Sequence, residues 1–398
     1  MLSLRSLHLR GALVLLASVG CQAVVGIGGR QAPDVTPADT DAGASADGGG
    51  PAPSPDASGD APKVCRVSEE RCGDVCADLR TDERHCGRCG HGCLGAGCKN
   101  GECVPSVWVP GSASVIVSGV WVNGDEVVYR SAGDTVISAP LVGKDRQSGV
   151  ERAIVEIGIY PQIVPLAGST VLVVEHAPGA RLRVLDLATR AWSVLYAQAS
   201  LTPAFRNAVV DGDDVYWATR ADLRHVKLDG TGYEVVHTVT TKPFGVAPGL
   251  ALTPTTIYFG VEDGNDLWAI DRAPGAVARK LDAGDGSAAY ATVDGAHVLW
   301  TAGTAVRELP LPDEGPPTSR TVGTLAAHVA VKRDGAIWIG DANFHKPDPM
   351  LSRVVRYDLA THTATVVASN LPAMGQIAVD DRWVYMPMFE KGIWRVAR

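Results

Sequence analysis

The stretch DGDDVYW, residues 211–217, decides the fold because variants of it recur along the whole C-terminal part of the chain. The seven copies are NGDEVVY (123–129), AGSTVLV (167–173), DGDDVYW (211–217), TPTTIYF (253–259), DGAHVLW (294–300), RDGAIWI (333–339) and DDRWVYM (380–386). Their last residues are 44, 44, 42, 41, 39 and 47 positions apart. A second phrase, DLAT, begins at Asp186 and again at Asp358, a distance of 172 residues. Both phrases indicate one unit of about 43 residues.

Each unit has the composition of short β-strands joined by tight turns. Asn-Gly or Asp-Gly pairs supply the positive φ angles of two-residue hairpins at 123–124, 211–212, 294–295 and 334–335. Repeats of about 40 to 45 residues with four short strands are typical of β-propeller blades. The sequence therefore predicts an all-β, seven-bladed β-propeller over residues 105–398. A six-bladed ring stays open, because Val173 replaces the aromatic residue in the second copy.

The last copy is one strand short of a complete blade. It ends with GIWRVAR (392–398), while SVWVP (106–110) precedes the first copy as an extra strand. We expect residues 106–110 to complete the last blade, which would remove two free sheet edges. The phrases VYWATRADLRHVKLDGTG (215–232) and DLWAIDRAPG (266–275) resemble YWTD-type and related bacterial propeller repeats. YWTD domains usually have six blades, whereas seven copies are visible in this chain.

A cysteine-rich segment, residues 64–104, precedes the repeats and contains few large apolar side chains. Its eight cysteines are Cys65, Cys72, Cys76, Cys86, Cys89, Cys93, Cys98 and Cys103. Such a small segment needs covalent or metal staples, and an even cysteine count, together with the N-terminal export signal described below, favours four disulfides. Zinc is the alternative, because His85 and His91 lie among the cysteines. The run from Cys72 to Cys103 resembles a Stig1-type cysteine-rich repeat, which implies a small extracellular disulfide module.

The N-terminal residues have the features of an export signal followed by a tether. Arg5 and Arg10 precede an apolar run over 11–20, too short to span a bilayer. Residues 18–21, SVGC, resemble a lipobox, which implies that residues 1–21 form a lipoprotein signal whose Cys21 is acylated; simple secretion stays open. Residues 22–63, rich in Ala, Pro, Gly and Asp, are predicted to be a disordered linker. We expect an outer-membrane or cell-surface lipoprotein, or an extracellular protein.

Composition and motifs restrict the function. The net charge of -8 disfavours nucleic acid as a partner. The sequence has no GxSxG, HExxH or P-loop motif. Our first hypothesis is a non-enzymatic surface lipoprotein, a monomer held at the membrane by its lipid, that displays the propeller to a protein or carbohydrate partner. The alternative is a lactonase-like, metal-assisted hydrolase with Asn207, Asp341 or His345 near the ion. Enzymatic activity is left open, and no cofactor is predicted apart from Ca²⁺ as an option.

Propellers usually bind ligands at one end of the central channel. Residues expected there come before innermost strands or from the insertion DANFHKPDPM (341–350), and they are Gln162, Asn207, His328, Asp341, Asn343, His345 and Gln376. The insertion can equally be an exposed polar loop whose side chains stabilise turns. The scattered histidines His176, His225, His237, His297 and His362 are predicted to be surface or strand residues rather than ligands.

Overall fold

The computed structural model describes residues 64–398 except 112–115, 133–137, 159–161, 176–179, 199–206, 220–221, 239–248, 262–265, 274, 284–287, 313–317, 322–326, 342–351, 373 and 389–390. The predicted signal, Cys21 and the linker lie outside these residues. The regular structure of the described residues is entirely β. None of it is a helix that could span a membrane.

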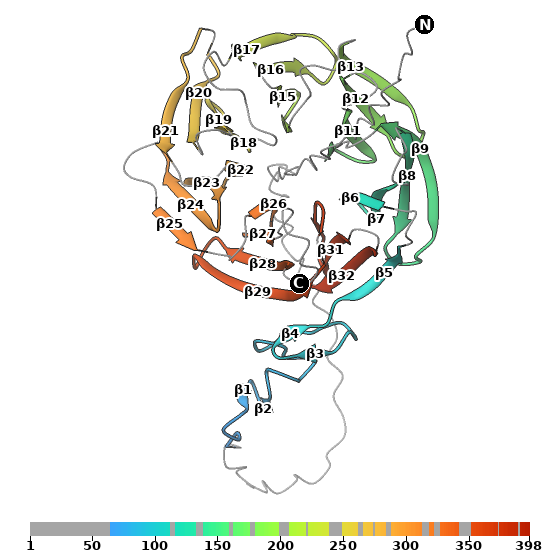
Figure 1. Cartoon of the computed structure of the whole chain (residues 1–398), viewed down its shortest axis with the longest axis vertical. Coiled ribbons are helices and arrows are strands. Elements are labelled where there is room, and N and C mark those ends of the chain that lie inside the picture. Colours follow the sequence, from blue (N-terminus) through green and yellow to red (C-terminus); the bar gives the residue numbers. More distant parts are fainter. Residues whose placement is uncertain are drawn as a thin grey trace, which may run out of the picture.

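Seven four-stranded antiparallel sheets stand around a central axis (Figure 1). Blade 1 contains β6 (Ile116–Asn123), β7 (Glu126–Ala132), β8 (Ser138–Asp145) and β9 (Glu151–Gly158). Blade 2 contains β10 (Gln162–Pro165), β11 (Thr170–Glu175), β12 (Ala180–Asp186) and β13 (Trp192–Gln198). Blade 3 contains β14 (Ala208–Asp211), β15 (Asp214–Ala218), β16 (Asp222–Lys227) and β17 (Glu234–Thr238). Blade 4 contains β18 (Leu250–Leu252), β19 (Thr256–Val261), β20 (Asp266–Asp271) and β21 (Arg279–Ala283).

The remaining blades follow the same order from the axis outward. Blade 5 contains β22 (Ala288–Val293), β23 (His297–Ala302), β24 (Ala305–Pro310) and β25 (Thr318–Thr321). Blade 6 contains β26 (Ala327–Arg333), β27 (Ala336–Asp341), β28 (Ser352–Asp358) and β29 (Thr363–Leu371). Blade 7 contains β30 (Ala378–Val379), β31 (Trp383–Met388), β32 (Gly392–Ala397) and β5 (Ser106–Pro110). The seven-bladed prediction is confirmed, and the six-bladed alternative is wrong.

Blade 7 joins the two ends of the repeat region. Its outermost strand β5 pairs antiparallel with β32, so that Val109 lies opposite Ile393 and Ser106 opposite Arg395. The expectation that residues 106–110 complete the last blade is confirmed. The innermost strands of neighbouring blades contact one another all the way round the axis. The ring is therefore closed by strand pairing, without a covalent link.

The recurrent hydrophobic position explains why the sheets pack. In every blade it lies on the second strand and its side chain is buried: Tyr129, Val173, Trp217, Phe259, Trp300, Ile339 and Met386. Each side chain belongs to an apolar cluster of buried residues. Burying a large side chain stabilises the fold by about 1.5 to 3 kcal/mol. The period seen in the sequence thus marks the packing layer between neighbouring sheets.

The DLAT phrase marks a turn between the third and fourth strands. Asp186 Oδ1 accepts hydrogen bonds from the N–H groups of Ala188, at 2.8 Å, and Thr189, at 3.1 Å. Asp358 holds the equivalent turn of blade 6, where the Thr361 N–H donates to Asp358 Oδ1 at 2.9 Å. The aspartate satisfies backbone donors that the turn leaves unpaired. The repeated phrase is thus a local folding signal.

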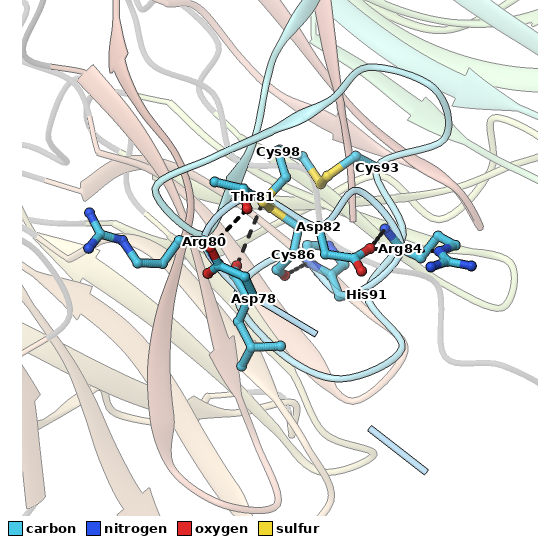
Figure 2. The surroundings of a disulfide bond; sticks show 11 residues. Asp78, Arg80, Thr81, Asp82, Arg84, Cys86, His91, Cys93 and Cys98 are labelled. Carbon is cyan, nitrogen blue, oxygen red and sulfur yellow. Dashed lines mark hydrogen bonds and ion pairs between the residues drawn. A yellow bond between two sulfur atoms is a disulfide. The ribbon is translucent and has the colours of Figure 1, made fainter. Parts of the chain in front are cut away.

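The eight cysteines between residues 64 and 104 form four disulfides, and Figure 2 shows the surroundings of one of them, with Cys86 and Cys98 labelled. The pairs are Cys65–Cys76, Cys72–Cys89, Cys86–Cys98 and Cys93–Cys103. Four very short strands accompany them, β1 (Glu70–Cys72), β2 (Val75–Ala77), β3 (Cys98–Lys99) and β4 (Glu102–Cys103). We call residues 64–104 the disulfide module. Its sulfur atoms are bonded to one another, which argues against the zinc alternative.

The disulfide module lies beside the ring, against the outer strand of blade 6 (Figure 1). The hydroxyl of Ser369, in β29, donates to Glu102 Oε2 at 2.6 Å. Buried Cys86, Cys93 and Cys103 share one apolar cluster with residues of blades 6 and 7, among them Leu371. β5 then follows β4 after two residues. The module therefore covers part of an outer sheet edge and leads directly into the closing strand.

Candidate functional site

The two ends of the channel are built differently. At one end, which we call the turn end, hairpins join the first to the second strand of every blade and the third to the fourth strand of blades 1 to 6. At the other, the loop end, segments join the second strand to the third, and each blade to the next. Among the residues that the sequence singled out, the described ones belong to the loop end: Gln162, Asn207, His328, Asp341 and Gln376.

Gln162 and Asn207 occupy equivalent places in blades 2 and 3. Gln162 is the first residue of β10, Asn207 immediately precedes β14, and both side chains are buried. Gln162 Nε2 donates to the Ala208 carbonyl at 3.1 Å, and the Ala208 N–H donates to Gln162 Oε1 at 2.7 Å. The Gln162 amide thus reproduces a strand-like pair of hydrogen bonds between two blades. This contact gives Gln162 a structural role, and its part in ligand binding stays a prediction.

Gln376 holds the corresponding place in blade 7. It forms a parallel bridge with Gly119, the neighbouring position of blade 1. Its side chain is 5% exposed, and Nε2 is buried without a hydrogen-bond partner in the described structure. Leaving a buried amide donor unpaired costs about 1 to 3 kcal/mol. Such a group is suited to donate to an oxygen atom of a ligand.

A buried ion pair lies at the loop end of blade 2. Glu175, the last residue of β11, accepts a hydrogen bond from Arg183 Nη2, and the Nε of Arg181 lies 3.7 Å from Glu175 Oε2. The Arg183 guanidinium also lies over the Trp192 ring, 4.5 Å from its centroid. Two arginines thus lie close to one buried carboxylate at this corner.

A second polar group lies beside it on blade 3. Arg224 Nη2 donates to Asp222 Oδ2 at 2.7 Å, and Arg224 Nη1 donates to the Tyr196 hydroxyl of blade 2 at 2.8 Å. The Tyr196 ring stacks on Tyr233, with centroids 5.0 Å apart. Glu175, Arg183 and Arg224 were not among the site residues predicted from the sequence. The available signal was a charge within a strand of otherwise apolar residues, as in TVLVVE (170–175).

The other residues predicted as ligands lie in or next to blade 6 in the sequence. Asn343 and His345 lie outside the described residues, and the backbones of His328 and Asp341 are in β26 and β27. Within the described ranges, groups of three metal-ligand atoms occur only at Cys72, His85 and Cys89 and at Cys86, Cys93 and Cys103. All of these sulfurs belong to disulfides. A ligand-binding role for Asp341, Asn343 and His345 therefore stays a prediction.

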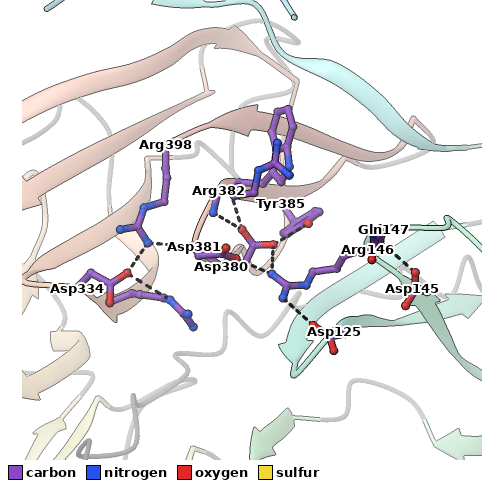
Figure 3. Close-up of polar contacts among 12 residues, drawn as sticks. Asp125, Asp145, Arg146, Gln147, Asp334, Asp380, Asp381, Arg382, Tyr385 and Arg398 are labelled. Carbon is purple, nitrogen blue, oxygen red and sulfur yellow. Dashed lines mark hydrogen bonds and ion pairs between the residues drawn. The ribbon is translucent and has the colours of Figure 1, made fainter. Parts of the chain in front are cut away.

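The turn end instead carries the ion pairs that hold blade 7 to its neighbours (Figure 3). Arg146 of blade 1 donates to Asp380 Oδ2 at 2.9 Å and to Asp381 Oδ1 at 2.7 Å. The Arg146 hydrogen bond lowers the pKa of Asp381. Buried Asp380 also accepts from the Tyr385 hydroxyl at 2.8 Å and from the Trp383 N–H at 2.6 Å. These contacts fasten the blade in which the ring closes.

Comparison with known proteins supports the fold. Virginiamycin B lyase from Staphylococcus aureus is 11% identical over 73% of this chain and 98% of the lyase, with a TM-score of 0.55. An oligogalacturonate lyase in complex with manganese is 12% identical over 74% of this chain and 92% of its own, with a TM-score of 0.54. PorZ, a surface component of the type-IX secretion system of Porphyromonas gingivalis, is 11% identical over 73% of this chain and 38% of its own, with a TM-score of 0.52.

No family model and no curated protein matches the sequence. At identities this low, the structural likeness shows the β-propeller fold alone. A shared fold carries many unrelated functions, so the function has to be argued from the site.

Proposed function

We propose that this chain is an exported, non-enzymatic binding protein that presents the loop end of its propeller to a protein or carbohydrate partner. The supporting observation is that blades 7, 2 and 3 place Gln376, Gln162 and Asn207 at one level of the loop end. The described disulfide module lies on the outer wall of the ring instead (Figure 1). Buried polar groups framed by charged residues suit a partner rich in hydrogen-bonding atoms.

Two variants at opposite ends of blade 2 test this proposal. Arg181 lies at the loop end in β12, and Arg190 is an exposed arginine in the following turn at the turn end. In capture experiments with surface extracts and glycan arrays, Arg181→Glu should weaken retention of the bound partner by about tenfold, because reversing an interfacial charge introduces repulsion. Arg190→Glu should bind like the parent protein. Equal capture by both variants would contradict loop-end binding.

The proposal includes a division of labour along the chain. Residues 1–21 would be the lipoprotein signal, 22–63 the tether, 64–104 a Stig1-like disulfide module and 105–398 the displayed propeller. Four disulfides support export, because such bonds persist in oxidising compartments. Labelling with a radioactive fatty acid should mark the parent protein and spare Cys21→Ala. An unlabelled parent found in the medium would favour simple secretion.

Metal-assisted hydrolysis at the loop end is the competing function, with Asn207, Asp341 or His345 near the ion. Thermal melts with Ca²⁺ and with EDTA separate the two proposals, because an ion that binds only the folded protein must raise its Tm. A rise that Asp341→Asn abolishes would favour the hydrolase. Equal melting temperatures in Ca²⁺ and EDTA would favour the binding protein.

A further inference from the structure

Two histidines from neighbouring blades lie side by side at the turn end, away from the site proposed above. His297 is the first residue of β23 in blade 5, and His362 lies in the turn between β28 and β29 of blade 6. Their ring centroids are 6.2 Å apart and their planes are nearly perpendicular, at 88°. The contact exists because adjacent blades bring two turns together.

Each imidazole is held through its Nδ1 atom by a carboxylate. His362 Nδ1 lies 2.8 Å from Glu308 Oε1, and His297 Nδ1 lies 3.3 Å from Asp294 Oδ2. Glu308 is 4% exposed and also accepts a hydrogen bond from the Tyr357 hydroxyl. A carboxylate on Nδ1 favours the tautomer with its proton there, which leaves the lone pair on Nε2.

The Nε2 atoms are available for a further ligand. In the described structure neither makes a hydrogen bond, and neither is among the buried atoms that lack a partner. The His297 and His362 side chains are 31% and 34% exposed. Solvent and small ions can therefore reach this pair of rings.

We propose that His297 and His362 together bind a divalent transition-metal ion, Zn²⁺, Ni²⁺ or Cu²⁺, through their Nε2 atoms, with water completing the coordination. Imidazole is a preferred ligand of these ions. Metal-bound histidines commonly donate a hydrogen bond from their other ring N–H to a carboxylate. Both rings already have a carboxylate at Nδ1. Two imidazoles on one ion, with metal–nitrogen distances near 2 Å, have centroids about 5 to 6 Å apart. The observed separation of 6.2 Å lies just above this range.

The charges around the pair favour a cation. Glu308 and Asp294 supply two carboxylates, and the Lys332 ammonium, which donates to the Val293 carbonyl, is the nearby positive group. The charges of Glu308, Asp294 and Lys332 sum to one negative charge, which attracts a divalent ion.

Calorimetric titration of the full, untagged chain with Zn²⁺, Ni²⁺ and Cu²⁺, with the disulfides intact, tests the proposal. The chain should bind one ion, and Cu²⁺ should bind more tightly than Ni²⁺. His297→Ala and His362→Ala should each weaken binding by at least about tenfold, and Glu308→Gln by about 10- to 100-fold through lost orientation of His362. His225→Ala is the matched control, because both of its ring nitrogens already face carboxylates, at 2.8 Å from Asp214 and 3.3 Å from Glu234. It should bind like the parent.

The outcomes are distinguishable from a loss of folding and from the loop-end proposal. Melting temperatures in EDTA identify variants that do not fold. If an alanine variant does not fold, His297→Gln or His362→Gln takes its place. In the Cu²⁺ electron paramagnetic resonance spectrum, the parent should show two coupled nitrogens and each single variant one. Parent-like affinity in both His297 and His362 variants, or no binding by the parent, would overturn the metal site and leave loop-end binding unaffected.

Discussion

The disulfide module and the propeller close on themselves by different physical means. The module has four covalent links within residues 64–104, whereas the ring of residues 105–398 contains no cysteine. Val64 and Val67 of the module are almost fully exposed, while the recurrent hydrophobic residue of every blade is buried. A segment of this size has too little apolar surface to bury, but seven blades can share theirs with neighbours. The comparison shows where covalent staples are needed.

Reduction with a dithiol should separate the two regions with the largest effect. The four bridges close segments with sequence separations of 10 to 17 residues. Each contributes about 2 to 4 kcal/mol, so the module should lose its structure while the ring keeps its own. Hydrogen exchange followed by mass spectrometry should show rapid exchange in residues 64–104 and retained protection in blades 3 and 4. Simultaneous loss of protection in those blades would mean that the module is required for the ring.

Removing a buried carboxylate from blade 7, where the ring closes, should destabilise the propeller. Asp380 is 1% exposed and its carboxylate accepts from Arg146, Tyr385 and two backbone N–H groups. Asp380→Ala should lower the free energy of unfolding by about 3 to 5 kcal/mol, because it leaves buried donors without their partner. Urea denaturation of parent and variant measures the difference.

Asp381 provides the matched control at the adjacent position. Its side chain is 64% exposed and shares the same arginine, Arg146. Asp381→Ala should cost only about 0 to 1 kcal/mol, since exposed ion pairs contribute little. Equal losses in the two variants would contradict the idea that burial of Asp380 fastens blade 7.

A smaller effect is expected from the turn aspartates, and it should depend on pH. The Thr361 N–H, followed by other hydrogen bonds, lowers the pKa of Asp358 to about 2. An aspartate whose pKa is lowered by folding stabilises the protein above its unfolded pKa, near 3.9, and this contribution disappears as the pH falls toward 2. Asp358→Asn should therefore reduce stability by about 1 kcal/mol at pH 7 and by much less near pH 2.

The measurement is a series of urea melts between pH 2 and 7. The difference between parent and Asp358→Asn should shrink steadily below pH 4. A difference that stays constant over this range would mean that the charge of Asp358 does not stabilise the turn. Because DLAT recurs at Asp186, the same variant there provides an independent replicate in blade 2.

The fold could be predicted because its signals are local and repeated. Each blade has its own hairpin turn and its own buried residue at the recurrent hydrophobic position. The number of repeats in the sequence therefore equals the number of sheets. The extra strand over residues 106–110 revealed the closure because the last copy lacked one. The disulfide pairs could not be chosen in the same way, since 105 pairings fit eight cysteines.

The sites were harder to predict because they join residues that only the ring brings together. Gln162 was expected just before an innermost strand and is the first residue of that strand, but its contact with Ala208 depends on the distance between two blades. His297 and His362 were regarded as ordinary surface or strand residues. Nothing in either turn alone indicates that the two imidazoles lie 6.2 Å apart.

The pairing of β5 with β32 has a consequence for the order of folding. Val109 is among the first residues of the propeller to be synthesised, and its partner Ile393 is among the last. Contacts between such distant residues form slowly, because a long loop must be closed first. Blades 1 to 6 can assemble while translation continues, but β5 must wait for the final strands. Completion of the circle is therefore expected to be the last, rate-limiting step in maturation.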